Sequence, residues 1–139
     1  MPTKQETFDT VVAHARKQKC QAYDKGKGVW CCYRTEDGKK CFAGCLIPDE
    51  LYDPEMEGGA VGVSLGDGNY RTGLVVSTSS QTKLVSDTIE SLGYDCGFVY
   101  ELQKAHDQWL PADWEDQFAR LAAKHGLTYV PPDSTPVPV

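Results

Sequence analysis

The sequence predicts an α+β fold: a single small domain with about four helices packed against one or two short antiparallel β-hairpins. Apolar residues recur at helical spacing near both ends of the chain, whereas β-prone residues interrupted by glycine-rich turns lie between them. The strands are therefore grouped and do not alternate with helices, which argues against a parallel doubly wound sheet. With 139 residues, we expect one domain over 1–130 and a proline-rich C-terminal tail over 131–139.

The first helix is predicted from about residue 4 to residue 18. Thr3 and Glu6 have the spacing of a capping box, in which each side chain bonds the backbone amide of the other residue. The apolar stripe of this helix has the spacing i, i+3, i+4, i+7 and consists of Phe8, Val11, Val12 and Ala15.

Two segments are predicted to form hairpins. In the first, "VWCCYR" and "KKCFAG" flank a turn at Asp37-Gly38, although the second arm could pass directly into a short helix ending at Pro48. We favour a hairpin with a brief second arm. In the second, "AVGVSL" and "YRTGLVVST" flank a turn at 66–69, and the many glycines leave open whether 59–80 is an ordered hairpin or a mobile flap. The stretch between them, "PDELYDPEMEGG", is typical of an acidic loop.

Three further helices are predicted after residue 80. The first has apolar residues at i, i+4, i+7 and closes at Gly93 as its C′ residue. The second begins at an Asp95 cap, carries His106 on its apolar stripe and ends before Pro111. The third has Pro111 at its first helical position and a Schellman ending at Gly126.

The composition limits the class of partner. A net charge of -6, from 20 acidic and 14 basic residues, argues against generic nucleic-acid binding. No apolar run approaches the 18 or so residues that a membrane span needs. The start, "MPTKQETFDTVV", lacks the apolar region of a secretory signal, so we expect a cytoplasmic protein whose six cysteines are free thiols or metal ligands.

Four cysteines between residues 31 and 45 raise the question of a zinc site. Their C-C-x8-C-x3-C spacing differs from the paired C-x2-C knuckles of structural zinc sites, and adjacent residues on a strand point to opposite faces. We interpret this corner as packing by small buried thiols and expect no cofactor. A zinc site is the alternative, with the candidate ligands Cys31, Cys41, Cys45 and His106.

The sequence holds no recognisable catalytic signature. A cysteine nucleophile would need a histidine base, and the best placed combination is Cys41, beside two lysines, with His106 or His14. Neither histidine lies in a known catalytic pattern, and there is no phosphate-binding glycine loop or calcium-loop spacing. We therefore predict no catalytic residue and a protein that is not an enzyme.

Aromatic and guanidinium groups near the predicted turns are candidates for binding a ligand or partner. Such groups anchor interfaces and stack on nucleotides, although any one of them could instead pack in the core. The candidates are Trp30, Tyr33, Arg34, Tyr52, Tyr70 and Arg71.

The run "CCYRTEDGKKCFAGCLIPDELYDPEMEG", with "LQKAHD" and "WEDQFARLAAKHGLTY", resembles small uncharacterised proteins encoded by tailed phages and prophages. The shared core has the form YRxxDGxxCxxGCLIPDE, and the resemblance covers most of residues 3–130 except the less familiar 59–80. It implies a phage accessory protein acting in an infected bacterial cell, and it carries over no catalytic residue. Many small acidic phage proteins antagonise host defences by binding.

The leading hypothesis is therefore a non-enzymatic, phage-type binding protein that occludes a host protein or sequesters a small nucleotide-type ligand. The alternatives are a zinc-stabilised interaction module and a cysteine-dependent enzyme. A homo-oligomer is compatible with each of them.

Overall fold

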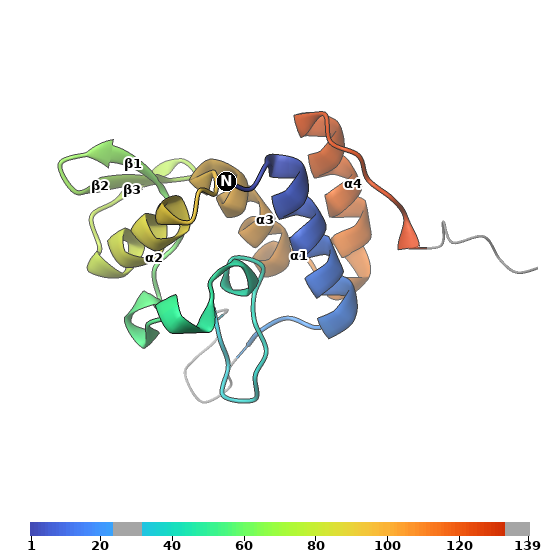
Figure 1. Ribbon diagram of the computed structural model, residues 1–139, viewed down its shortest axis with the longest axis horizontal. Helices are drawn as coiled ribbons and strands as arrows, with labels where there is room; N and C mark the ends of the chain where they lie inside the picture. The colour runs from blue at the N-terminus through green and yellow to red at the C-terminus, as the bar shows by residue number, and fades with distance from the viewer. Residues whose placement is uncertain (24–31, 133–139) are drawn as a thin grey trace, which may run out of the picture.

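The computed structural model describes residues 1–23 and 32–132, so the candidates Trp30 and Cys31 lie outside the described residues. Within the described ranges the chain forms four α-helices, four short 3-10 helices and one three-stranded antiparallel sheet (Figure 1). This arrangement confirms the predicted α+β class and the single small domain.

Apart from the start of the last helix, the helices begin and end where their local signals predicted. They are α1 (Lys4–Gln18), α2 (Ser80–Ser91), α3 (Cys96–Gln108) and α4 (Trp114–His125). The capping box of α1 is formed, since the Glu6 amide donates to the Thr3 hydroxyl at 3.1 Å and the Thr3 amide donates to the Glu6 carboxylate at 3.0 Å. At the end of α4, Gly126 adopts a φ of 67° and the Leu127 amide donates to the Ala122 carbonyl at 2.8 Å, as a Schellman ending requires.

One helix start differs from the prediction. Pro111 begins the 3-10 helix η4 (Pro111–Asp113), and α4 starts directly after it at Trp114. Proline supplies the helical φ at this position, and the tighter 3-10 turn satisfies the first amides before the α-helical pattern begins.

The first predicted hairpin is reduced to a single bridge in the described residues, between Arg34 and Lys40. After Lys40 the chain turns at once into η1 (Gly44–Leu46), because Gly44 packs directly against the backbone of Tyr33. A Cβ atom at Gly44 would lie 2.1 Å from the Tyr33 carbonyl oxygen, so only glycine fits there. The second arm is therefore brief, as we favoured, and η1 occupies the place of the short helix in the alternative prediction.

The predicted acidic loop contains two further 3-10 helices, η2 (Asp49–Leu51) and η3 (Pro54–Met56). Asp53 caps η3 by accepting the Glu55 amide at 2.9 Å. Met56 is buried at the end of η3, so the loop contributes to the core in spite of its acidic composition.

The second predicted hairpin is an ordered sheet, but it has three strands where we expected two: β1 (Val63–Gly66), β2 (Asn69–Thr72) and β3 (Val75–Ser77), in the order β1-β2-β3. The first turn has positive φ at Asp67 and Gly68, as a type I′ turn requires. The predicted second arm breaks at Gly73, which has a φ of 67° and begins a second two-residue turn.

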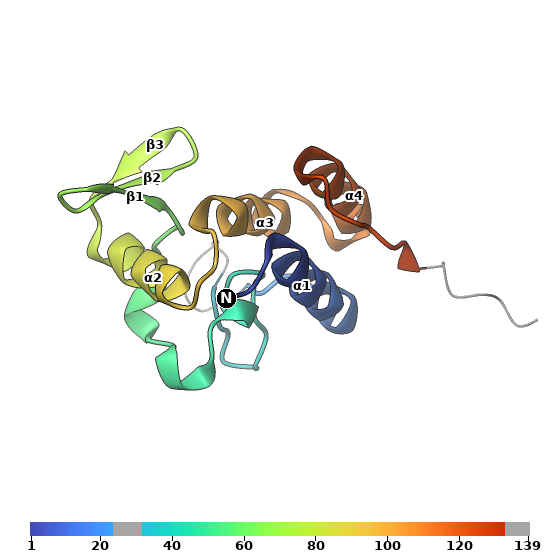
Figure 2. The ribbon, with the colours of Figure 1, turned by 45° about the horizontal axis from the view of Figure 1, so that its top comes forward.

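The two ends of the domain have different packing. Helices α1, α3 and α4 lie side by side, whereas α2 and the sheet lie at the opposite end (Figures 1 and 2). Phe42 connects the helices to the segment 32–62, because its ring contacts those of His106, Trp114 and Phe118 at centroid distances of 5.0, 4.8 and 5.6 Å. Among the described residues, no helix is both long and apolar enough to cross a membrane.

Candidate functional site

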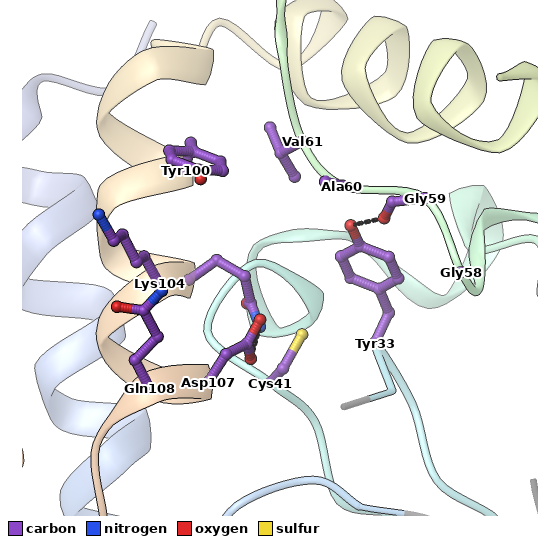
Figure 3. A pocket seen from close by; sticks show the side chains of 11 residues that line it. Tyr33, Cys41, Gly58, Gly59, Ala60, Val61, Tyr100, Lys104, Asp107 and Gln108 are labelled. Carbon is purple, nitrogen blue, oxygen red and sulfur yellow. Dashed lines mark hydrogen bonds between the residues drawn. The ribbon is translucent and has the colours of Figure 1, made fainter. Parts of the chain in front are cut away.

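A cavity of about 470 Å³ opens between α3 and the segment that leads to the sheet. Tyr33, Cys41 and the chain at 58–61 form one side, and α3 forms the other. Figure 3 shows Asp107 reaching from α3 toward Cys41, with Tyr33 opposite. The volume lies within the range of small-molecule sites in proteins.

The helix α3 supplies the cavity wall because its two faces differ in polarity. Its core face carries apolar residues, with His106 among them, and the opposite face carries residues spaced i, i+4, i+7 and i+8. These cavity-lining residues are Tyr100, Lys104, Asp107 and Gln108.

Asp107 is held in place by two donors. The Gln103 side-chain amide donates to its Oδ1 at 2.6 Å, and His106 Nδ1 donates to the same oxygen at 2.8 Å. Both bonds end on Oδ1, which leaves Oδ2 without a hydrogen-bond partner in the described part of the chain. The Asp107 side chain lines the cavity and is 41% exposed, so its carboxylate is accessible to a ligand.

The orientation of both donors is fixed by backbone amides of the core. The Ala22 amide donates to His106 Nε2 at 3.1 Å, so Nε2 carries no proton and the ring proton lies on Nδ1. The Ala43 amide donates to Gln103 Oε1 at 2.8 Å, so the amide nitrogen of Gln103 faces the carboxylate. Asp107 therefore meets two donors and acts as an acceptor with a defined direction.

Two other groups complete the cavity. Lys104 lies at the rim and lines both this cavity and an adjoining open groove between α3 and the sheet. Its ammonium group forms no ion pair with the described residues. Tyr33 presents its ring as a wall, and its hydroxyl donates to the Gly59 carbonyl (Figure 3).

Cys41 lies at the floor of the cavity as a buried, protonated thiol. Burial raises the pKa of Cys41 well above its usual range, and the nearby carboxylates of Asp107 and Glu57 raise it further. Its sulfur accepts the Gly44 amide at 3.3 Å. A nucleophilic cysteine requires a depressed pKa, so the geometry gives no support to Cys41 in that role.

The histidines proposed as bases for Cys41 are also engaged. Both ring nitrogens of His106 have partners, and His14 Nε2 lies 2.8 Å from the Lys40 carbonyl oxygen. In a catalytic dyad the histidine is free to take a proton from the nucleophile. Here the buried His106 instead uses its Nδ1 proton to orient the exposed Asp107 carboxylate.

The described residues contain no group of three or more side chains that could hold a metal ion. Of the four candidate ligands, Cys31 lies outside the described residues and His106 has no free nitrogen. The Cys45 thiol donates to the Phe42 carbonyl at 3.0 Å, and burial raises its pKa to about 12. The zinc-stabilised module therefore has no supporting geometry in this part of the chain.

Three of the binding candidates come together in one internal network around Glu57. Its carboxylate accepts the Tyr33 amide at 2.9 Å, the Arg34 amide at 3.1 Å and the Tyr52 hydroxyl at 2.6 Å. The Arg34 guanidinium lies over the Tyr52 ring, 4.6 Å from its centroid, and pairs with Asp49 at 2.6 Å. These groups hold the segment 33–57 together, and of the three only Tyr33 also lines the cavity.

The other two candidates lie apart, on β2. Tyr70 is buried and its hydroxyl donates to Asp87 on α2 at 2.6 Å, which fixes the sheet to that helix. Arg71 is exposed and lines the open groove, together with Tyr100 and Lys104.

Sequence reasoning missed the α3 residues that line the cavity. Their spacing marks a polar helix face, but such a face is ordinarily exposed to solvent. What distinguishes this helix face from an ordinary exposed one is the opposite wall of the cavity, formed by residues 33–41 and 58–61. Only the tertiary structure brings these residues close to α3. No protein-family model, curated protein or solved structure matched this chain in our comparisons.

Proposed function

We propose that this protein is a non-enzymatic binding protein that takes a small nucleotide-type ligand in the cavity beside α3. The observation that carries the proposal is Asp107, a carboxylate that lines the cavity and is held there by Gln103 and His106 through one of its two oxygens. Fixing a polar group before the ligand arrives lowers the entropic cost of binding, and this favours a recognition role.

The lining supports a ligand with three features. A carboxylate accepts charge-assisted hydrogen bonds, so Asp107 suits the amino and ring N–H groups of a nucleobase. The rings of Tyr33 and Tyr100 offer apolar surfaces for the base. Lys104 at the rim suits a phosphate, which would lie toward solvent and extend into the open groove.

The biological setting of the proposal rests on the resemblance to phage and prophage proteins. In that setting the protein would sequester a small signalling nucleotide in the cytoplasm of an infected bacterium and so antagonise a host defence. Occlusion of a host protein is the other form of the hypothesis, and a pull-down from host lysate separates the two.

Isothermal titration calorimetry with a panel of purine and pyrimidine nucleoside mono- and diphosphates tests the ligand proposal. Asp107→Asn keeps an oxygen that can accept from Gln103 and His106 but loses the charge, so we expect at least about tenfold weaker binding. Lys104→Gln should weaken the binding of diphosphates more than the binding of monophosphates. Asp116→Asn, at an exposed carboxylate on α4, is the matched control and should bind as wild type. The proposal fails if no member of the panel binds, or if Asp107→Asn binds as tightly as wild type.

A further inference from the structure

The outer edge of β3 is the most exposed apolar element of the described structure. Strand β3 lies at the end of the sheet and pairs with β2 alone among the described residues. Figure 2 shows it at the periphery, away from α1 and α4. Leu74 in the preceding turn is fully exposed, and Val75 and Val76 are 64% and 57% exposed.

The register of the sheet shows which backbone groups of β3 are open. Thr72 and Val75 flank a two-residue turn, so they form a hydrogen-bonded pair. The next pair, Arg71 and Val76, is therefore of the non-hydrogen-bonded kind, in which the amide and carbonyl point away from the partner strand. The amide and carbonyl of Val76 thus point outward at the free edge.

The two edges of the sheet differ in their protection. Strand β1 has a register shift between Ser64 and Gly66, and bulges of this kind discourage pairing with another chain. Strand β3 has no such irregularity, and it contains neither proline nor a charged residue, which are the other common means of protecting an edge. The edge of β3 is therefore open to a further strand.

The charge distribution indicates which strand would pair there. Residues 72–82 contain no charged side chain, although the chain as a whole carries a net charge of -6. Two copies of an acidic protein repel over most of their surface, but they can meet at this segment without apposing like charges. An antiparallel edge is also self-complementary about a two-fold axis.

We propose that β3 pairs antiparallel with β3 of a second copy, with Val76 opposite Val76 on the two-fold axis. The two three-stranded sheets then form one continuous sheet across a homodimer. This inference does not depend on the ligand proposed for the cavity.

Sedimentation velocity over a range of concentrations tests the proposal, with wild type expected to form a dimer. Val76→Lys places two like charges opposite each other across the axis, so we expect the dimer dissociation constant to rise at least about tenfold. Leu110→Lys is the matched control, because Leu110 is 66% exposed but lies before η4, away from the sheet, and this variant should dimerise as wild type. Circular dichroism spectra identical to wild type establish that each variant is folded.

Hydrogen exchange gives a second measurement that needs no variant. The Val76 amide should exchange slowly at concentrations where the dimer forms and fast on dilution, whereas the Val75 amide, bonded within the sheet, should change less. A wild-type chain that stays monomeric overturns the proposal. So does a dimer that survives Val76→Lys, or one whose Val76 amide exchanges fast at all concentrations.

Discussion

Glu57 illustrates how one side chain determines a loop that has little regular secondary structure. It accepts three hydrogen bonds, from two consecutive backbone amides at 33–34 and from the Tyr52 hydroxyl. Backbone amides without a ladder partner need another acceptor, and here a carboxylate 24 residues away from Tyr33 supplies it. The acidic residues of this loop therefore differ in their contribution to the fold, because some accept hydrogen bonds that hold the loop together and others only face solvent.

Glu57→Gln tests this role. The variant keeps one acceptor oxygen but places an NH2 group where a donor now bonds, so we expect the free energy of unfolding to fall by about 1–3 kcal/mol. Glu55→Gln is the matched control, since Glu55 is exposed and the same change there should leave stability within about 0.5 kcal/mol. Urea unfolding followed by tryptophan fluorescence measures both. Equal midpoints for Glu57→Gln and wild type would show that the network contributes nothing to stability.

Substituting alanine for either of two glycines in different elements is expected to change stability by very different amounts. Gly44, at the start of η1, meets the Tyr33 carbonyl, and a Cβ there would lie 2.1 Å from its oxygen. Gly97 lies in the first turn of α3 in an ordinary helical conformation, and the nearest atom to a Cβ added there would be an Asp95 carboxylate oxygen at 3.3 Å.

We therefore expect Gly44→Ala to lower the free energy of unfolding by at least about 2 kcal/mol, because the backbone itself must move. Gly97→Ala should stay within about 1 kcal/mol of wild type, because alanine favours the helix and the contact can relax. Thermal unfolding by circular dichroism compares the two. A Gly44→Ala variant as stable as wild type would mean that η1 does not pack on Tyr33 as described.

The same elements explain how far the sequence predicts the structure. The helices were predicted with their caps because each signal lies within a few residues, as with Thr3 and Glu6 or Gly126. The first hairpin was predicted, but its reduction to a single bridge was not, because the contact that ends it, Gly44 on Tyr33, depends on tertiary packing. The cavity was missed for the same reason, since Asp107 on α3 gains its role only when Gln103 and His106 are fixed by Ala43 and Ala22.

On the scale of the whole molecule, the segment at 33–45 contains two buried ionisable groups, Tyr33 and Cys41, and a partly buried one, Cys45, all in their protonated forms. Burial raises the pKa of the Tyr33 hydroxyl and of the Cys41 thiol well above their usual values, and it raises that of Cys45 to about 12. Each group is protonated at neutral pH in both the folded and the unfolded chain, so none of them lowers stability there. They oppose folding only where the unfolded chain can lose a proton that the folded chain retains.

The sign of the pH dependence is set by these pKa values. An unfolded thiol ionises near pH 9, whereas folded Cys45 ionises near pH 12, so the unfolded state binds fewer protons between these limits. The free energy of unfolding should therefore be flat near neutral pH and fall above about pH 9, by up to about 1.4 kcal/mol per pH unit for each such group. Cys41 and Tyr33 act in the same direction because their folded pKa values are also raised.

Urea unfolding at a series of pH values between about 7 and 11 measures this dependence, and Cys45→Ala isolates one group. The alanine variant loses the hydrogen bond to the Phe42 carbonyl and should be less stable near neutral pH. Its stability should nevertheless fall less steeply above about pH 9, because one titrating thiol has been removed. A wild-type slope equal to that of the variant would place the Cys45 thiol in contact with water, and the packed corner between Tyr33 and Cys45 would then have to be open.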